Sequence, residues 1–307
     1  MTPTRVERIF GYRHLTEADL SPPPGPHVFF DPVDTEVGVW ATVDLIGEGS
    51  TVLDLGSGSG AAAAAVARAG ARRIHGLDIS RESVKWASEN YSRDTGGARV
   101  TFGVGDFSKL STSELIEIFG APAPAVVTSN PPYVPVVPPA GQRKVSVDGG
   151  PDGLRWVRVI VRQAAGLGSD LALTIGSYSS PRIAARLLAE SGYGIRSVTL
   201  GALPLGDFTL SHMDQVLRLE EEGEAPLLRG EDGVIRYVIV GLSCRRVEEK
   251  AGDAPDLGFA PDDLLSLLNL ACRSRTGALE ALDAAPATWP FPVRIVVLPD
   301  SPVRRHS

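Results

Sequence analysis

Cysteine, basic charge and long apolar runs are all scarce in this chain of 307 residues. The two cysteines, Cys244 and Cys272, lack the spacing of metal ligands, so we expect neither a metal site nor a disulfide, and a cytoplasmic location. No stretch approaches the roughly 20 apolar residues that cross a bilayer, and the N-terminal residues lack the apolar core of a signal peptide. A membrane partner is therefore not expected.

The scarcity of basic charge bears on the partners of the protein. The 30 lysines and arginines are outnumbered by 37 acidic residues, which leaves a net charge of −7. A protein that binds nucleic acid usually needs a basic surface to displace the counterions of the phosphates, so a nucleic-acid partner is disfavoured. The hydrophobic content of 43% and the charged content of 22% are those of an ordinary globular domain.

Strand-like and helix-like segments alternate between about residues 49 and 242, which is typical of a doubly wound, mostly parallel α/β sheet. Strands are expected in "TVLDL", "RIHGLD", "ARVTFGV", "PAVVTSN" and "LALTIG", with helices between them. Two more, in "IRSVTLGAL" and "VIRYVIVGLSC", are expected to close the sheet as an antiparallel pair.

Three units are expected along the chain: an N-terminal segment (1–30), the α/β domain (31–246) and a C-terminal extension (247–307). The extension contains one helix-like and one strand-like segment, which is too little for a core of its own. We therefore expect it to pack on the main domain or on another subunit, as in a homodimer.

A glycine-rich turn, "GSGSG", follows the first strand. Glycine there lets a ligand approach the backbone, and the next helix presents free amide donors to it. The turn also satisfies the dinucleotide pattern G-x-G-x-x-A, with Asp78 at the ribose-binding position, so an NAD-dependent oxidoreductase is an alternative. The turn residues expected to bind the nucleotide are Gly56, Ser57, Gly58 and Gly60.

Acidic residues follow three successive strands and favour a different cofactor. Asp54 precedes the first glycine, where dinucleotide folds usually have an apolar residue, and Asp106 ends the third strand. Asp78 and the adjacent Ile79 are expected to bind a ribose; Asp106 would accept from an adenine amino group and Phe107 would cover the ring. One such acid could merely cap the next helix. Three in succession favour a pocket for a cationic nucleotide such as S-adenosylmethionine.

The fourth strand ends in a corner, "NPPY", whose two prolines remove amide donors and fix two φ angles. A planar amide, guanidino or amino nitrogen is a poor nucleophile because its lone pair is delocalised. A site can favour methyl transfer to it by accepting both N–H hydrogens. The Asn130 side-chain oxygen and the Pro131 carbonyl are the expected acceptors, and Tyr133 is expected to stack on the substrate. The alternative is that Pro-Pro only ends the strand.

In combination, these motifs resemble those of class I S-adenosylmethionine-dependent methyltransferases, over about residues 31–244. The resemblance implies S-adenosylmethionine as the cofactor, bound also beside Asn130, and a seven-stranded sheet of Rossmann-like type with an antiparallel seventh strand.

A narrower resemblance is to the HemK/PrmC group, the release-factor glutamine methyltransferases. "NPPY" followed by "VDGGPDGLRWVRVIV" is similar to their Asp-Gly-Gly-x-Asp-Gly-Leu segment after the corner. "DPVDTEVGVW" resembles their Pro-Arg-Pro-Asp-Thr-Glu segment beside the cofactor, so Asp34, Thr35 and Glu36 carry over but the arginine does not. The chain departs from the group where it has Thr174-Ile175-Gly176-Ser177 for their Glu-Ile-Gly-Gln. Only some thirty residues precede the Asp-Thr-Glu motif here, whereas the group carries a helical N-terminal substrate domain.

We therefore expect an N-methyltransferase that acts on a small or peptide-like metabolite, as in natural-product biosynthesis. Alternatives are a protein glutamine methyltransferase, a nucleic-acid amino-methyltransferase and a cofactor-binding module without catalysis. The loop around residues 142–144, "GDFTLSHMDQV" and the C-terminal extension are expected to shape the acceptor pocket. His212 and Asp214 are candidates for a base, against the simpler reading of a solvated loop.

Overall fold

The computed structural model of the chain describes residues 6–21, 23, 28, 30–95, 98–137, 147–247, 257–283 and 289–298. The loop expected around residues 142–144 to shape the pocket lies outside these ranges. Within them, no helix is both long and apolar enough to cross a membrane.

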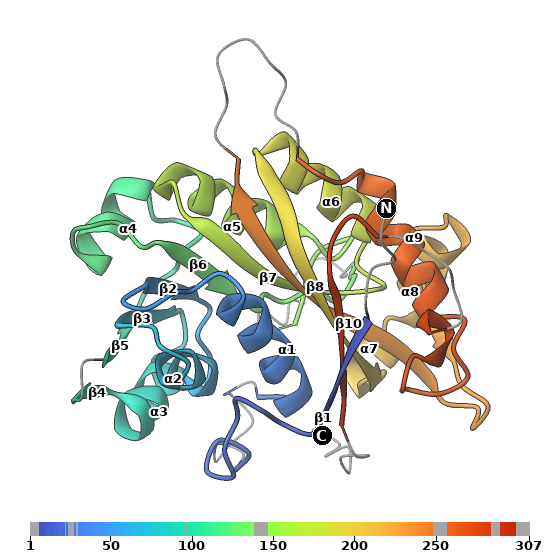
Figure 1. Cartoon of the computed structure of the whole chain (residues 1–307), viewed down its shortest axis with the longest axis horizontal. Coiled ribbons are helices and arrows are strands. Elements are labelled where there is room, and N and C mark those ends of the chain that lie inside the picture. Colours follow the sequence, from blue (N-terminus) through green and yellow to red (C-terminus); the bar gives the residue numbers. More distant parts are fainter. Residues whose placement is uncertain are drawn as a thin grey trace.

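One large sheet runs through the described chain (Figure 1). Its seven central strands are, in spatial order, β5 (Ala98–Val104), β3 (Arg73–Asp78), β2 (Thr51–Leu55), β6 (Val126–Ser129), β7 (Asp170–Gly176), β10 (Ile235–Arg246) and β8 (Tyr193–Pro204). The first five of these are parallel to one another, whereas β10 is antiparallel to both β7 and β8. This order confirms the predicted mostly parallel sheet with an antiparallel last strand.

Four further strands extend or border this sheet. They are β1 (Val6–Phe10), β4 (Arg93–Thr95), β9 (Leu228–Arg229) and β11 (Val293–Val297). β11 pairs in parallel with β8, and β1 pairs in parallel with β11. The two ends of the chain therefore continue the same sheet. β1 was not predicted, because a five-residue segment in which one residue is buried carries little periodic signal.

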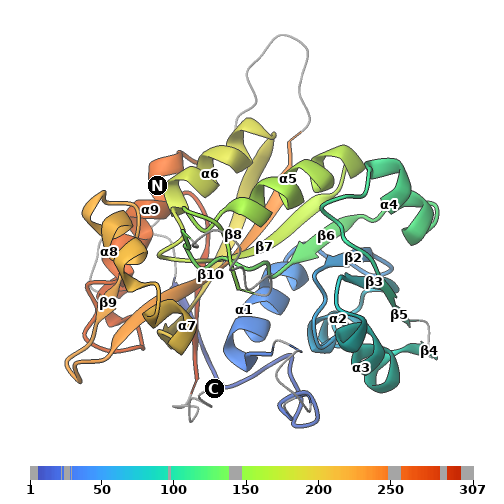
Figure 2. The ribbon, with the colours of Figure 1, turned by 180° about the vertical axis from the view of Figure 1, so that it is seen from behind.

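Helices cover both faces of the sheet (Figures 1 and 2). One face carries α1 (Pro32–Val43), α2 (Ala61–Arg68) and α3 (Arg81–Tyr91). The other carries α4 (Thr112–Phe119), α5 (Arg155–Leu167), α6 (Pro181–Glu190) and α9 (Pro261–Ala271). Between β8 and β9 lie α7 (Asp207–Leu210) and α8 (Met213–Glu221), and a 3₁₀ helix spans Glu280–Leu282. The fold is therefore doubly wound, as predicted.

Successive side chains of β2 point to opposite faces of the sheet and pack against the helices on both. Leu53 and Leu55 pack in the core under α5 and α6, while Val52 packs in the core under α1 and α2. A strand buried on both faces is apolar nearly throughout, so an aspartate within it is exceptional. Asp54 is that residue, and it is 4% exposed.

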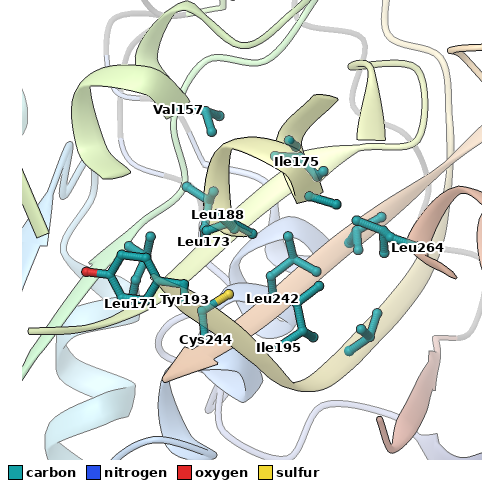
Figure 3. Packing of buried hydrophobic residues seen from close by; sticks show 14 of the residues in the cluster. Val157, Leu171, Leu173, Ile175, Leu188, Tyr193, Ile195, Leu242, Cys244 and Leu264 are labelled. Carbon is teal, nitrogen blue, oxygen red and sulfur yellow. The ribbon is translucent and has the colours of Figure 1, made fainter. Parts of the chain in front are cut away.

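The C-terminal extension shares the main core. Figure 3 shows Leu264 of α9 in one cluster with Leu173 and Ile175 of β7 and with Leu242 of β10. All four side chains are essentially inaccessible to solvent. Burial of each contributes about 1.5–3 kcal/mol, so α9 is integral to the domain.

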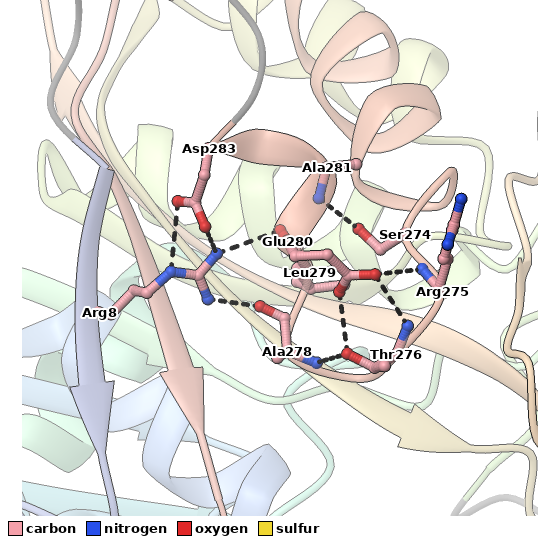
Figure 4. A network of polar contacts seen from close by, with 9 residues as sticks. All are labelled: Arg8, Ser274, Arg275, Thr276, Ala278, Leu279, Glu280, Ala281 and Asp283. Carbon is pink, nitrogen blue, oxygen red and sulfur yellow. Dashed lines mark hydrogen bonds and ion pairs between the residues drawn. The ribbon is translucent and has the colours of Figure 1, made fainter.

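Polar contacts join the C-terminal extension to β1 and to the end of α1. Arg8 of β1 donates to Asp283 at 2.7 Å and to the Leu279 carbonyl at 3.3 Å (Figure 4). Arg294 of β11 forms a two-pronged ion pair with Asp44, at 3.0 and 3.2 Å, just beyond α1. The extension therefore holds the helix that carries part of the candidate site.

Candidate active site

The glycine-rich turn forms a close-packed cradle at the carboxyl end of β2. Gly60 has a φ of 83°, and a Cβ there would lie 2.7 Å from the Ala87 Cβ, so only glycine fits without strain. The Asp78 carboxylate, at the end of β3, accepts from the amides of Gly58 and Ser80, both at 2.8 Å. The turn and the second acid therefore lie together.

Two side chains at this turn have buried polar atoms without a hydrogen-bond partner in the described part of the chain, Asp54 Oδ2 and Ser57 Oγ. Burial, and then the charge of Asp78, raise the pKa of Asp54 to about 7. The Gly56 amide is instead used within the turn, donating to the Leu77 carbonyl at 2.8 Å. Unpaired buried polar atoms destabilise a protein by about 1–3 kcal/mol each, so this cradle fits a ligand that brings donors and positive charge.

The neighbouring strand ends offer an apolar surface and a further acid. Ile79, an apolar side chain, is 55% exposed, and Phe107 is partly buried against the core. Burial alone would raise the pKa of Asp106, but hydrogen bonds from Ser108 and Lys109 outweigh it and lower the pKa. Asp106 is therefore an ionised acceptor beside an apolar surface, an arrangement suited to an aminated ring.

The corner follows β6, between β2 and β7. The Ser129 hydroxyl donates to the Leu55 carbonyl at 2.6 Å and ties the corner to the glycine turn. Asn130 is half-buried, and its side-chain oxygen accepts a hydrogen bond from the Thr174 hydroxyl on β7. Pro131 has no amide donor of its own, and no described group donates to its carbonyl. Two acceptors therefore stand at a donor-poor turn.

Tyr133 lies inside a buried polar cluster. Its hydroxyl donates to Asp34 Oδ2 at 2.7 Å and lies 3.0 Å from the Tyr237 hydroxyl. Burial, and then the neighbouring Asp31, raise the pKa of Asp34 to about 7, against the interactions with Tyr133 and Asn130, which lower it. Asp34 Oδ1 is buried and has no hydrogen-bond partner in the described part of the chain. Burial raises the pKa of Tyr133 well above its usual range, so this phenol remains a neutral donor.

The segment after the corner supports its backbone. The Gly149 amide donates to the Val134 carbonyl at 2.9 Å, and a Cβ on Gly149 would lie 2.8 Å from the Tyr133 Cα. A Cβ on Gly153 would lie 2.5 Å from the Tyr133 carbonyl oxygen. Buried Asp148 forms an ion pair with Arg155 at 3.1 Å. The glycines are therefore required for close backbone approach.

Thr35 and Glu36, which the resemblance also indicated, form hydrogen bonds within or next to α1. The Thr35 hydroxyl donates to the Asp31 carbonyl at 2.7 Å within the first turn of α1. Glu36 is inaccessible to solvent and accepts from three consecutive amides, those of Arg13, His14 and Leu15. Glu36 therefore fastens the N-terminal segment to α1.

The candidate base is engaged within its own turn. The His212 ring lies 2.9 Å from the Phe208 carbonyl oxygen and 4.5 Å, between centroids, from the Phe208 ring. Asp214 is exposed in the first turn of α8. Neither side chain contacts the corner in the described part of the chain, although Phe208 and Met213 pack against the cluster that contains Tyr133.

Two tyrosines of this site were not predicted. Tyr178, just after β7, and Tyr237, on β10, have ring centroids 4.8 Å apart and both lie next to Tyr133. Tyr178 follows β7 and Tyr237 lies on β10. Their proximity to the corner cannot be predicted from sequence without knowing that β10 lies beside β7.

Part of the chain is similar in sequence to known methyltransferases. A family model described as a methyltransferase domain matches residues 52–118, which include the glycine turn and the acids at 54, 78 and 106. A release factor glutamine methyltransferase of Moorella thermoacetica is 36% identical over 185 residues, which are 56% of this chain and 62% of the relative. The chain thus spans less than two thirds of that relative's length.

Two solved structures are similar at low identity. One, from Pyrococcus horikoshii, is a proposed RNA methyltransferase with 16% identity and a TM-score of 0.44, covering 70% of this chain and 83% of that one. The other, a geranyl diphosphate methyltransferase in complex with S-adenosylmethionine, has 14% identity and a TM-score of 0.39, covering 79% and 99%. By sequence, residues 52–118 are therefore similar to a methyltransferase domain, and a longer part of the chain is similar to a release factor glutamine methyltransferase.

Proposed function

We propose that this chain is an N-methyltransferase that transfers a methyl group from S-adenosylmethionine to a planar amide, guanidino or amino nitrogen of a small or peptide-like metabolite. The corner carries the proposal, because Asn130 Oδ1 and the Pro131 carbonyl are acceptors on a donor-poor backbone. It adjoins the glycine turn through the bond from Ser129 to Leu55.

The residues at the ends of β2, β3 and β5 fit the cofactor, which supplies an activated methyl group when bound. Asp54 and Ser57 have unpaired buried oxygens that suit the cationic methionine end. Asp78, held by two backbone amides, keeps lone pairs for ribose hydroxyls. Asp106 and the apolar surface beside it suit the adenine.

At the corner, the protein's part is to orient the acceptor nitrogen. Asn130 Oδ1 and the Pro131 carbonyl accept its two N–H hydrogens, which favours loss of planarity as the N–C bond forms and the C–S bond breaks. The nitrogen then carries an additional proton, which is released to solvent or to an acceptor group.

Asn130→Ala tests this role. We expect turnover to fall by at least about 100-fold, because one acceptor is lost in the transition state, while affinity for S-adenosylhomocysteine stays within about threefold. Methyl transfer and isothermal titration measure the two quantities. A variant that retains full turnover would show that the corner is not catalytic, and tight binding of NADH instead of S-adenosylhomocysteine would overturn the cofactor assignment.

A protein glutamine methyltransferase is the second candidate, supported by the 36% identity to a release factor glutamine methyltransferase. The two candidates differ in acceptor size. Glutamine-containing release-factor fragments, guanidino compounds and aminated rings, each incubated with [methyl-³H]S-adenosylmethionine, separate them. Labelling of intact release factor in preference to all small acceptors would favour the second candidate.

A further inference from the structure

We propose that Asp34 and Thr174 are positioning residues, which together hold the Asn130 carboxamide so that its oxygen, and not its nitrogen, faces the methyl acceptor. This inference rests on the proposed function of the corner. It assigns to two side chains outside the Asn-Pro-Pro-Tyr segment the orientation on which methyl transfer depends.

An asparagine side chain has two nearly isosteric ends with opposite hydrogen-bonding character. Its oxygen accepts, whereas its nitrogen carries two donors. If the Asn130 carboxamide rotated by 180°, its two N–H donors would face the N–H groups of the methylated substrate. The hydrogen bond that orients the substrate nitrogen would then be replaced by a repulsive contact. The orientation of Asn130 must therefore be fixed by its neighbours.

Asp34 supplies the asymmetric constraint. An ionised carboxylate only accepts hydrogen bonds, and Asp34 Oδ1 is buried without a hydrogen-bond partner in the described part of the chain. The interaction of Asn130 with Asp34 lowers the pKa of this carboxyl, as a donor facing it would, so the Asn130 nitrogen is the end that faces Asp34. Asp34 is itself held by the Tyr133 hydroxyl at 2.7 Å, and it is 1% exposed. Water therefore does not compete for this carboxylate.

Thr174 contacts the other end of the amide. Its hydroxyl donates to Asn130 Oδ1, which leaves the second lone pair of that oxygen for an N–H of the acceptor. Thr174 is 1% exposed, and α1 approaches it closely: a Cβ on Gly38 would lie 3.3 Å from the Thr174 methyl group. The hydroxyl is therefore confined beside Asn130.

The groups facing Asp34 determine how pH acts on this arrangement. They are Asp31 on its own helix, Tyr133 at the corner, Tyr178 after β7 and Tyr237 on β10. Burial raises the pKa of each tyrosine above its usual range, so the phenols stay neutral. Asp34, with a pKa of about 7, ionises near neutrality, and protonation gives it a donor that no longer selects one amide orientation.

The side-chain amide of Asn130 can be observed directly, because the chain has three asparagines, Asn90, Asn130 and Asn269. Protein labelled with [¹⁵N]asparagine gives three side-chain NH₂ signals, and the one lost in Asn130→Ala is assigned. We expect this signal to shift with pH with a midpoint near 7, while the other two serve as internal controls. Asp34→Asn adds a fourth asparagine signal, so the Asn130 signal is identified there as the one lost in the Asp34→Asn/Asn130→Ala double variant, and we expect it to be pH-independent. An Asn130 signal that is insensitive to pH and to Asp34→Asn overturns the proposal.

Kinetics test the consequence for catalysis, with the most active compound of the acceptor panel as probe. We expect kcat of the native enzyme to rise as pH increases through about 7, and Asp34→Asn to lower kcat at least tenfold with S-adenosylhomocysteine affinity within about threefold. Thr174→Val should lower kcat about three- to tenfold, and Thr174→Ser should restore it. Native kcat in both Asp34→Asn and Thr174→Val overturns the proposal, whereas a native protein that methylates no acceptor overturns the proposed function instead.

Discussion

Asp54 is a buried acid whose ionisation is unfavourable in the free protein. Its pKa, raised by burial to about 7, lies above the ordinary value of 3.8. Between these pH values the folded chain holds a proton that the unfolded chain has lost, so this group's contribution to stability falls as pH rises through the window. A cationic ligand would reverse the effect by favouring the carboxylate.

Asp54→Asn should therefore stabilise the protein at pH 8 while weakening cofactor binding. We expect the free energy of unfolding in urea to rise by about 2–4 kcal/mol at pH 8 and to change little at pH 4, because the native aspartate is neutral there. Affinity for S-adenosylhomocysteine should fall. If the variant were less stable than the native protein at pH 8, the charge of the Asp54 carboxylate would already be stabilised by neighbouring groups in the ligand-free protein.

The site residues were predictable from sequence to different degrees. The acids at 54, 78 and 106 could be placed because each lies within two residues of the carboxyl end of its strand, and parallel strands align these ends at one sheet edge. Asp54 is the last residue but one of β2, Asp78 ends β3, and Asp106 comes two residues after β5, not at its end as predicted. The contact between Tyr133 and Asp34 joins residues 99 positions apart. It could not be predicted, because it depends on how α1 docks on the sheet.

At the scale of elements, the segment 148–154, Asp-Gly-Gly-Pro-Asp-Gly-Leu, braces the backbone of the corner. Gly153 and Gly192 have nearly equal positive φ angles, 77° and 78°. They differ in surroundings, since a Cβ on Gly192 would meet nothing within 4 Å. The pair therefore separates backbone strain from the requirement for close approach.

Gly153→Ala should lower the free energy of unfolding by at least about 2 kcal/mol more than Gly192→Ala does. Both variants carry the strain of a positive φ, about 1–2 kcal/mol, but only Gly153→Ala displaces the Tyr133 carbonyl. Urea denaturation measures the difference. Methyl transfer should fall in Gly153→Ala alone. Equal destabilisation and equal activity would mean that this segment does not brace the corner.

Elements with a long periodic pattern were the predictable ones. α5 and β7 appear as the alternation of apolar segments indicated. The helices α7 and α8, between β8 and β9, were not predicted, because the segment "GDFTLSHMDQV" is short and polar and is ordered by packing on the Tyr133 cluster. Tertiary contacts determine such elements more than local propensity does.

For the whole molecule, Arg294 joins the C-terminal extension to the α/β domain. It is 15% exposed, pairs with Asp44, which is 18% exposed, and its guanidinium lies 4.0 Å from the Trp40 ring centroid. The exposed pair between Arg218 and Glu222, at 2.9 Å, provides a control with similar chemistry and little burial.

Arg294→Ala should destabilise the protein by about 2–3 kcal/mol and lower the Tm by several degrees, because it leaves Asp44 partly buried without its cation. Arg218→Ala should change stability by less than about 0.5 kcal/mol. Thermal denaturation compares the two. If both variants melted together, the contact between Arg294 and Asp44 would not fasten the extension.

The nature of the methylated atom tests the central claim most directly. The labelled product from the acceptor panel is analysed by tandem mass spectrometry, for the native enzyme and for Asn130→Ala. We expect one methyl group on a planar nitrogen in the native reaction and none above background in the variant. Methylation of oxygen, sulfur or carbon, or undiminished nitrogen methylation in Asn130→Ala, would contradict the assignment of the corner as the acceptor site.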